Sequence, residues 1–414
     1  MYQPAEVELE LLAEVQSAPE ALADPAAEGQ VSIQIARTES EVEELRPLWN
    51  KWKGHRDSEI DFFLQVVRTD PETLRPHVIL LLRNGQPDAL LVGRLERKKI
   101  VYRVGYVRMP GIPTLNLTFV YGCLRGNSSE RNSLAFVQSI IGSLGRGEAD
   151  VAYFHHPDTK SPLYRAAIEL PGFASRDHAP RAEDHYFMQL PDSLDQVYLR
   201  LSKNHRADLR RKAKKLLSGF EGRTEVKCFR TPEDMEIAYP LMEAIARKTY
   251  QRGLGVGFQD TPHTRQRLNL FARQGWMRAY LLYLGGVPCA FWAGAVCHGV
   301  FCSDYLAFDP DFSDVSPGTF LMTNAIGALC QERATGIDFG HGEGRYKEQF
   351  GNLRVLDASV QIFAASPKGI GLAATHTTTT LTEGLLKDAL RRSNLMPTIK
   401  KLWRRSAATK LAAA

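Results

Sequence analysis

Two segments in the second half of the chain combine residue types that suit the binding of an anionic ligand. In the first, a strand ending at Phe308 leads through a polar loop to Ser316-Pro317-Gly318-Thr319, where an apolar helix begins. Ser316 suits the N-cap of that helix and Pro317 its first position. The first N–H groups of a helix lack intrahelical acceptors, so Ser316, Gly318 and Thr319 are candidate pyrophosphate-binding residues. An ordinary capped helix gives the same pattern.

The second segment, residues 338–347, places glycine at positions 340, 342 and 344 directly after a predicted strand. Glycine lets the backbone approach a ligand closely and adopt conformations closed to other residues, so Gly340 and Gly342 are candidate cofactor-binding positions. His341 adds a titratable group, and Arg345 and Lys347 add two cations. The spacing differs from G-x-G-x-x-G and no ribose-binding acid follows a second strand, so the segment does not indicate a dinucleotide site.

Hydrophobic periodicity predicts two consecutive units with the same order of elements. In the first we expect strands at 31–36, 77–82, 89–95, 99–104, 116–121, 151–155 and 185–190, and helices at 40–52, 58–68, 128–145 and 161–169. In the second we expect strands at 226–229, 278–283, 287–296, 300–308, 336–339 and 359–364, and helices at 233–252, 261–274 and 317–334 with a short helix after the glycines. Asn84-Gly85 and Gly285-Gly286 suit tight hairpins. The fold class is therefore α+β with α/β/α layers, duplicated in architecture although no repeat is visible residue by residue.

The chain divides by composition into two units and two tails. The first unit is predicted over residues 31–192 and the second over 193–368. Residues 1–30 contain seven acids and neither Lys nor Arg, which is typical of a disordered acidic tail. Residues 369–414 form a basic amphipathic tail that either lies on an anionic membrane surface or is disordered.

A cationic segment, residues 196–217, opens the second unit and is predicted to be one long helix. Its many Lys and Arg residues face a single acid, Asp208. Lys203, Arg206 and Arg210 are candidate substrate-binding residues, because a cation cluster favours nucleotide-sugar phosphates, an RNA backbone or anionic lipid. A solvated helix face is the alternative. No aromatic residues interleave the cations, which disfavours single-stranded RNA.

Bulk composition bounds the class of protein. With 414 residues, 44% hydrophobic and 24% charged residues and a formal net charge of +5, the chain is typical of a globular protein with two domains. No segment approaches the ~20 apolar residues of a membrane-spanning helix, so we expect a cytoplasmic protein that can also be peripheral at the inner membrane face. The six cysteines form no CxxC pair and lie in apolar contexts, which predicts buried thiols and no metal site.

Together these features resemble a known family of acyltransferases. The resemblance rests on Leu201-Ser202-Lys203-Asn204-His205-Arg206, Leu209-Arg210-Arg211, Ser316-Pro317-Gly318, Asp338-Phe339-Gly340-His341-Gly342, Tyr346-Lys347 and Phe350-Gly351. It covers about residues 195–352 and is to the GNAT-type (Gcn5-related N-acetyltransferase) proteins grouped as CelD-like or BioF2-like domains. Their relatives, the FemABX peptidoglycan aminoacyltransferases, carry two GNAT-like units. The resemblance therefore implies two tandem GNAT-like units, each a mixed, mostly antiparallel sheet flanked by helices.

The resemblance implies an acyltransferase that uses acyl-CoA, with acetyl-CoA as the leading co-substrate, and an acceptor amine or hydroxyl on an amino sugar, polysaccharide or cell-envelope precursor. In this superfamily the acceptor attacks the thioester directly, so the protein must position both partners and remove a proton. The catalytic candidates are His341 as base, with Asp304 and Glu343 behind it, and Tyr346 as donor to the departing thiolate. Lys347 would bind donor phosphates, and Arg345 an anionic acceptor.

Ordinary structural interpretations stand beside these roles. His341 also fits a plain loop residue, Tyr346 a core tyrosine, and Arg345 and Lys347 solvated surface charges. Asp304 and Tyr305 lie on the strand where GNAT-like folds splay apart to admit the thioester, and Tyr305 is a candidate substrate-binding residue there. Because side chains alternate along a strand, we expect one of these two to point into the core.

The donor has alternatives, because the usual GNAT phosphate loop, Arg/Gln-x-x-Gly-x-Gly/Ala, is absent. Residues 311–318 stand in its place with one glycine. An acyl carrier protein or an aminoacyl-tRNA is a possible donor, the latter bound through residues 203–215 in a FemABX-like reaction. A third alternative is a non-catalytic accessory protein of polysaccharide synthesis, attached through the basic tail.

Overall fold

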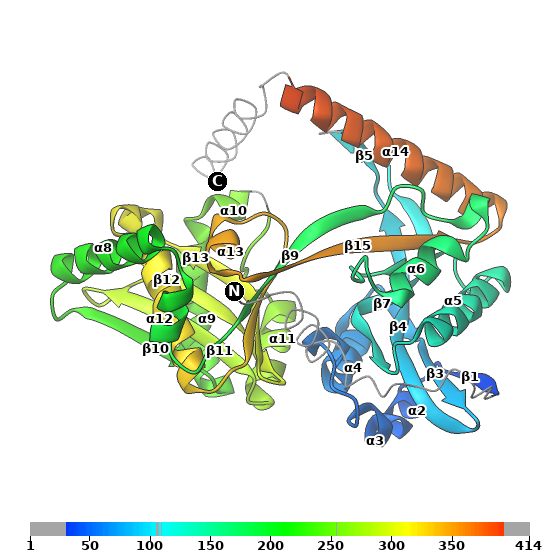
Figure 1. Cartoon of the computed structure of the whole chain (residues 1–414), viewed down its shortest axis with the longest axis horizontal. Coiled ribbons are helices and arrows are strands. Elements are labelled where there is room, and N and C mark those ends of the chain that lie inside the picture. The colour runs from blue at the N-terminus through cyan, green and yellow to red at the C-terminus, as the bar shows by residue number, and fades with distance from the viewer. Residues whose placement is uncertain (1–29, 105–106, 109, 254, 393–414) are drawn as a thin grey trace, which may run out of the picture. The chain divides into compact units, whose positions relative to one another are not determined.

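The computed structural model describes residues 30–104, 107–108, 110–253 and 255–392 (Figure 1). The predicted acidic tail, apart from Gln30, and residues 393–414 of the predicted basic tail lie outside the described residues. Two compact units make up the chain. The first contains the residues up to Glu183 together with the stretch that begins at Leu356, and the second contains Asp184–Val355. Two strands cross these boundaries, Arg181–Gln189 and Leu353–Phe363, and each is described below with the unit that holds most of it.

The first unit is a mixed sheet flanked by helices. Its elements are β1 (Val31–Ala36), α2 (Glu39–Glu44), α3 (Arg46–Trp49), η1 (Arg56–Ser58), α4 (Ile60–Thr69), β2 (Thr73–Pro76), β3 (Val78–Arg83), β4 (Gln86–Ile100), β5 (Arg103–Val104), β6 (Val107–Arg108), β7 (Ile112–Gly126), α5 (Glu130–Gly145), β8 (Val151–Phe154), α6 (Pro162–Glu169), η2 (Phe173–Ser175), β15 (Leu353–Phe363) and α14 (Pro367–Arg392). The strand order is β1-β3-β4-β7-β8-β15, with β2 on β4 and β5-β6 as a separate ribbon. Of the pairs in that order, β7 and β8 are parallel and the others antiparallel.

The second unit has its own mixed sheet. Its elements are β9 (Arg181–Gln189), α7 (Leu194–Arg200), α8 (Lys203–Gly219), β10 (Thr224–Phe229), α9 (Pro232–Arg247), α10 (Tyr250–Gly253), α11 (Pro262–Arg273), β11 (Met277–Leu284), β12 (Val287–Cys297), β13 (Val300–Phe308), η3 (Pro310–Val315), α12 (Pro317–Gln331), β14 (Gly336–His341) and α13 (Arg345–Phe350). The strand order is β10-β11-β12-β13-β14-β9. β13 and β14 are parallel, and the remaining neighbours are antiparallel.

The two sheets therefore share one topology. Each begins with a strand and a group of helices, continues through an antiparallel meander, and then crosses through a long helix into one parallel strand. The crossing helix is α5 in the first unit and α12 in the second. Both expected hairpins form, because Asn84 and Gly85 have φ of +51° and +76° and Gly285 and Gly286 have +61° and +84°. The architectural duplication predicted from the order of elements is present.

The last strand of each sheet was predicted to belong to the other unit. We expected the strand at 185–190 to complete the first unit and the strand at 359–364 to complete the second. Instead β9 pairs with β14, and β15 pairs with β8. A strand's hydrophobic pattern specifies which face is buried but not which sheet edge it joins, so the sequence order alone could not assign these two strands.

Local expectations also differ from the structure at several points, and the predicted helices 40–52 and 233–252 are each two helices, α2 with α3 and α9 with α10. The predicted strands 89–95 and 99–104 are mostly one strand, β4, which ends at Ile100. The predicted basic helix 196–217 is two helices, because the chain leaves helical geometry at Leu201 and Ser202 caps α8 by accepting a hydrogen bond from His205 N at 3.2 Å. β2 was not expected.

The chain after β15 continues as α14, whose first turns pack on the first unit. Leu372 is buried, and the Tyr102 hydroxyl donates to its carbonyl oxygen at 3.2 Å. The compact first unit thus includes residues 356–392, whereas we expected 356–368 in the second unit and a tail from 369. Among the described helices, none combines the length and apolarity needed to cross a membrane.

Candidate functional site

The candidate site of the second unit is organised by the divergence of β13 and β14. Their parallel ladder joins three residue pairs and ends at Cys302 and Asp338. Beyond that point β13 continues along β12 to Phe308, while β14 continues along β9 to His341. We call this divergence the strand fork. The candidates Asp304, Tyr305 and His341 all lie on its two arms.

The helix that follows one arm, α12, begins with unsatisfied backbone donors. Ser316 is its N-cap residue, as expected, but it has a φ of +55° and its side chain makes no capping hydrogen bond. Pro317 has no N–H, and Phe320 N donates to Ser316 O at 3.3 Å. The N–H groups of Gly318 and Thr319 are therefore the ones without an intrahelical acceptor. No acidic residue lies in this first turn.

The equivalent helix of the first unit has a different start. Ser129 caps α5 by accepting a hydrogen bond from Asn132 N at 3.4 Å, and Glu130 occupies the first turn. A negative side chain at a helix N-terminus occupies the electrostatic position that a bound anion would take. Of the two equivalent helix starts, that of α12 is the one suited to an anionic ligand.

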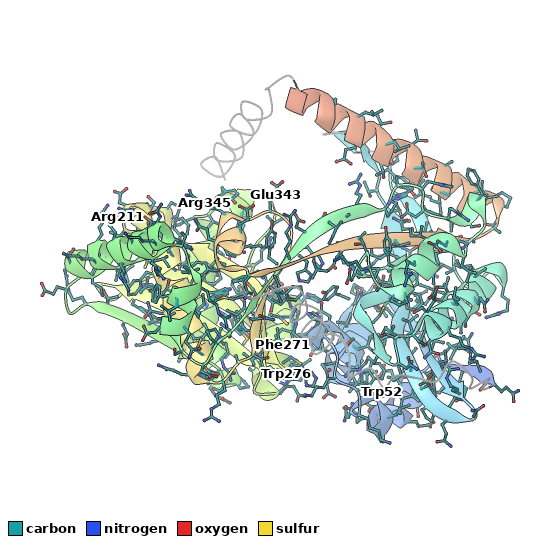
Figure 2. The ribbon with its side chains drawn as sticks, in the orientation of Figure 1. Trp52, Arg211, Phe271, Trp276, Glu343 and Arg345 are labelled. Atoms are coloured by element: carbon teal, nitrogen blue, oxygen red, sulfur yellow. The ribbon has the colours of Figure 1, made fainter. Side chains whose placement is uncertain are left out.

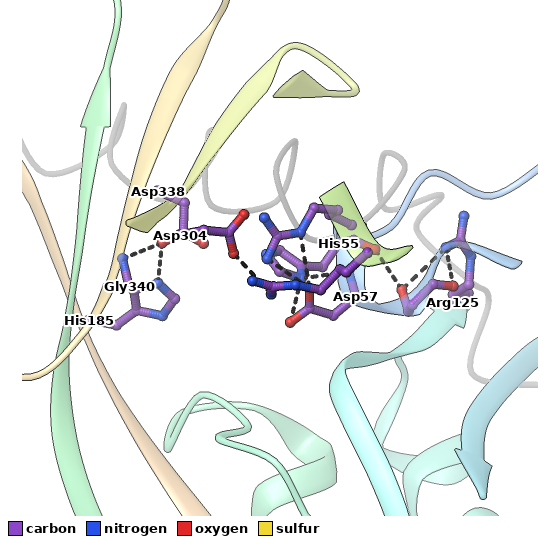
Figure 3. A network of polar contacts seen from close by, with 10 residues as sticks. His55, Asp57, Arg125, His185, Asp304, Asp338 and Gly340 are labelled. Atoms are coloured by element: carbon purple, nitrogen blue, oxygen red, sulfur yellow. Dashed lines mark hydrogen bonds and ion pairs between the residues drawn. The ribbon is translucent and has the colours of Figure 1, made fainter. Parts of the chain in front are cut away.

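A buried polar pair lies at the vertex of the fork (Figure 3). Asp338, the last ladder residue of β14, has its Oδ1 2.6 Å from Nε2 of His185 on β9, and both side chains are almost fully buried. The same carboxylate oxygen accepts a hydrogen bond from Gly340 N at 2.7 Å. A β-bulge between Asp338 and Gly340 turns this N–H towards the carboxylate. Asp338 therefore couples the neighbouring strand to the start of the glycine loop.

The glycine loop is held from its other side by Lys347. This lysine is 8% exposed, and its Nζ donates to the carbonyl oxygens of Gly340 at 3.1 Å and His341 at 2.6 Å. Gly340 and Gly342 have φ of +75° and +86°, and a Cβ at either would meet nothing within 4 Å. Glycine is needed there for backbone conformation rather than for close packing. Lys347 therefore holds the loop, and its predicted contact with donor phosphates stays a prediction.

His341 stands beside the buried pair. It is opposite His185 in the β14–β9 register, and the two ring centroids are 4.0 Å apart. His341 is partly exposed, whereas His185 is buried. Glu343 and Arg345, on the loop and at the start of α13, are exposed (Figure 2). The structure thus brings His341 to the fork and leaves Arg345 at the surface.

Asp304 and Tyr305 share one partner on α11. Arg267 donates from Nη1 to Asp304 Oδ1 at 3.3 Å and from Nη2 to the Tyr305 hydroxyl at 2.8 Å. The expected alternation fails because Ala293 pairs with Tyr305 while Gly294 pairs with Ser303, which leaves Asp304 as the extra residue of a β-bulge. The guanidinium thus holds both side chains.

Tyr346 packs near the fork through its ring. Its centroid is 5.9 Å from that of Phe339, edge to face. Burial, with a smaller contribution from Tyr250, raises the pKa of Tyr346 to about 12. The phenol is therefore neutral at physiological pH. Because a thiol has a pKa near 8.5, Tyr346 can donate a hydrogen bond to a thiolate but does not readily transfer its proton to one.

The predicted substrate-binding cations of α8 divide into two groups. Arg206 turns inward, and its Nη1 donates to the carbonyl oxygens of Tyr198 and Leu199 at 3.3 and 3.4 Å, where it caps α7. Lys203 and Arg210 are exposed. Sequence reasoning did not separate these groups, because it treated 196–217 as one helix.

Sequence reasoning missed three residues at the fork: His185, Asp338 and Arg267. His185 is assigned by pattern to the end of the first unit, and Arg267 lies on a separate helix, so nothing in their spacing connects them to the glycine loop. Asp338 was visible as the first residue of the Asp338-Phe339-Gly340 motif. A carboxylate at the end of a buried strand, directly before glycine, is the signal that could have selected it.

Comparison with known proteins assigns a fold family to this region. Residues 203–348 match the model of the acetyltransferase (GNAT) domain family. No curated protein sequence matches the chain. The chain thus contains a GNAT-type domain, while the finer CelD-like or BioF2-like assignment stays a prediction.

Solved structures extend the likeness to most of the chain. FemX, at 11% identity, aligns over 81% of this chain and 97% of its own with a TM-score of 0.55. L-PGS from Bacillus licheniformis aligns at 12% identity over 85% of this chain and 99% of its own, with a TM-score of 0.48. A tandem GNAT protein from the clavulanic acid biosynthesis pathway aligns at 10% identity over 81% and 99%, with a TM-score of 0.45. The predicted fold class is confirmed by the repeated topology of the two sheets and by the GNAT domain match in the second unit.

Proposed function

We propose that the second unit transfers an acyl group from acyl-CoA to an amine or hydroxyl of an amino sugar, polysaccharide or cell-envelope precursor. The observation that carries this proposal is the pair of free N–H groups of Gly318 and Thr319 at the start of α12, directly after the strand fork. A helix start of this kind suits the pyrophosphate of CoA. The first unit, whose equivalent helix is capped by Ser129, would serve the acceptor rather than the donor.

In this reaction the acceptor atom bonds to the thioester carbonyl carbon, the carbon–sulfur bond breaks, and the acceptor loses a proton while the thiolate gains one. His341 is the proposed base, because its imidazole is partly exposed on an arm of the fork and a ring nitrogen can accept a proton from the acceptor. Asp338 and Lys347 would act as positioning residues, since both fix the loop that carries His341. Tyr346 would donate a hydrogen bond to the developing thiolate.

Asp304 has a different proposed role. Its carboxylate is engaged by Arg267, which also binds the Tyr305 hydroxyl. In this proposal the carboxylate holds Arg267 in place and does not act as the base. We therefore propose that Asp304 and Tyr305 fix the conformation of the β13 arm through Arg267. Tyr305 would also line the part of the site that binds the acceptor.

The proposal is tested by the thermal stability of the purified chain with acetyl-CoA, longer acyl-CoAs and free CoA. A ligand at 100 times its Kd adds about 2.7 kcal/mol to the folded state, which corresponds to a shift of a few degrees in Tm. The variant Gly318→Trp is expected to abolish the shift by covering the start of α12. Gly172→Trp is the control, because Gly172 lies in the first unit and a Cβ there meets nothing within 4 Å, whereas a Cβ at Gly318 meets Phe308 Cδ1 at 3.3 Å.

Turnover is then measured as release of free thiol from the preferred acyl-CoA in the presence of glucosamine and of other amino sugars. His341→Gln is expected to lower this rate at neutral pH by 10²-fold or more, the scale of general base catalysis. Absence of a stability shift with every CoA species would refute acyl-CoA as donor. If Gly318→Trp leaves the shift in Tm unchanged, the donor does not bind at the start of α12.

A further inference from the structure

The outward side of α8 is a cationic surface that no part of the proposed reaction uses. Leu209 and Leu216 are buried on its inner side, whereas Lys203, Arg210 and Lys214 are exposed. The spacings of seven and four residues place these three cations on one side of the helix. We call Lys203, Arg210 and Lys214 the α8 face.

The charges of the α8 face are not neutralised. The one acid of the helix, Asp208, is bound by Arg211 at 2.6 Å and Lys212 at 2.7 Å. In the part of the chain that the structure describes, the side chains of Lys203, Arg210 and Lys214 make no hydrogen bond or ion pair. Three like charges in a row repel one another, so an anionic partner would be attracted along the whole helix.

The α8 face lies close to the proposed donor site. Lys215, next to the face, donates from Nζ to the carbonyl oxygen of Asp314 at 2.7 Å, and Asp314 belongs to η3, which leads into Ser316. α8 also packs against α12. A partner bound on the α8 face would therefore be next to the start of α12. Arg211, which lies beside the face on α8, is exposed to solvent (Figure 2).

The length of the α8 face favours an extended partner. From Lys203 to Lys214 the helix rises by about 17 Å, which exceeds a single diphosphate group. Two large apolar side chains flank the cations: Leu199 is 73% exposed at the end of α7, and Leu217 is 47% exposed at the end of α8. Apolar side chains contribute little to contact with an RNA backbone, but they suit a protein helix that carries both acids and apolar residues.

We infer that the α8 face docks an acidic acyl carrier protein, which delivers the acyl group to the fork as a phosphopantetheine thioester. This inference rests on the proposed function and names the form of its donor. The chemistry stays balanced, because the carrier's pantetheine thiolate replaces that of CoA as leaving group and takes up the proton. The terminal part of the donor is the same in both forms, so acyl-CoA would be accepted as a truncated donor.

The experiment compares two donors in the full chain: acetyl-CoA and a purified bacterial acyl carrier protein that carries an acetyl group on its phosphopantetheine. The test variant is the double charge reversal Arg210→Glu/Lys214→Glu. The matched control is Arg273→Glu, an exposed cation at the end of α11. Kd for the carrier protein without its acyl group is measured by fluorescence anisotropy at 50 and 200 mM salt, and kcat/KM is measured with both donors.

We expect the wild type and Arg273→Glu to prefer the carrier protein. The double variant should raise its Kd at least tenfold, weaken the salt dependence, and lower the ratio of kcat/KM for carrier protein to that for acetyl-CoA at least tenfold. The same ratio in the double variant and the wild type, with acetyl-CoA turned over by both, would refute the inference alone. Turnover of neither donor by the wild type would refute the proposed function as well.

A third outcome identifies a different partner. If the double variant loses binding to an unfractionated transfer RNA probe while its affinity for the carrier protein is unchanged, the α8 face is an RNA-binding surface and the inference is wrong. Circular dichroism of all three proteins shows whether the helix content is preserved, and a variant that unfolds is replaced by Lys203→Glu/Lys214→Glu.

Discussion

Nε2 of His185 lies 2.6 Å from Oδ1 of Asp338, at the point where two parallel strands separate. The same oxygen accepts the N–H of Gly340, which has a φ of +75° that few other residues tolerate. One buried carboxylate thus fixes both a neighbouring strand and the loop that carries His341. This pair makes the strand fork a structural centre as well as a candidate catalytic one.

Removal of Asp338 should destabilise the second unit strongly. Asp338→Ala removes the carboxylate that accepts from the Gly340 N–H and contacts the buried His185 imidazole, and the loss of such a buried acceptor costs about 1–3 kcal/mol for each group left unsatisfied. Urea unfolding of the variant measures the loss. Glu221→Ala is the control, because Glu221 is exposed and should change stability by less than about 0.5 kcal/mol. Equal unfolding free energies of the two variants would show that the contact between His185 and Asp338 does not stabilise the second unit.

Lys347 should be required for loop order more than for donor binding. Lys347→Met keeps most of the buried aliphatic volume but removes both hydrogen bonds to the loop carbonyl groups, a loss of about 3 kcal/mol for bonds from a charged donor. Hydrogen–deuterium exchange should rise at residues 340–344. Lys214→Met, at an exposed lysine, should leave exchange unchanged. A variant that loses CoA binding with a normally protected loop would instead support a direct phosphate contact.

The first unit should depend on a buried arginine. Arg125 Nη1 donates to the carbonyl oxygen of Ser58 and to Glu59 Oε1, both at 2.9 Å, and a Cβ on Gly54 would lie 2.6 Å from the same nitrogen. Arg125→Met should cost about 3–5 kcal/mol because it leaves a buried carboxylate without this partner.

The cause of that loss can be separated with a double variant. Arg125→Met/Glu59→Gln removes the residual charge and should recover part of the lost stability, as a double-mutant cycle measures. Additive losses from the two substitutions would show that the ion pair is not the source of the effect.

Stability should depend on acid pH through Glu243 on α9. Burial raises the pKa of this carboxyl, but hydrogen bonds from Arg252 at 2.7 Å and Arg247 at 2.8 Å and from Asp260 N at 3.0 Å outweigh it and lower the pKa from 4.5 to about 2. A lowered folded-state pKa stabilises the protein above pH 4.5, and this contribution is lost as the pH falls towards 2. The full contribution is about 3 kcal/mol.

The measurement is the difference in unfolding free energy between the wild type and Glu243→Gln as a function of pH. It should be constant above about pH 5 and shrink as the pH falls below 4.5. Glu233→Gln, at an exposed acid in the first turn of the same helix, is the control and should show little change over that range. A difference that does not vary with pH would show that Glu243 is uncharged or unpaired in the folded protein.

Local patterns were sufficient for most elements. β1 and β13 end where the alternation of apolar residues predicts, and the Asn84-Gly85 hairpin forms because both residues accept positive φ. Helices with clear caps, such as α11 behind Thr261, were also recoverable. These features depend on neighbours in the chain, so a single sequence contains the information.

The sequence by itself therefore determined the order of the elements, the duplicated α+β architecture, and the two polar segments around Gly318 and Gly340. Only the tertiary structure decided that β9 closes the second sheet, that His185 meets Asp338 across 153 positions of the chain, and that Arg267 engages Asp304. Hydrophobic periodicity specifies which face of an element is buried. The neighbour across a sheet edge depends on which strands compete for it, and that competition is settled only when the whole core packs.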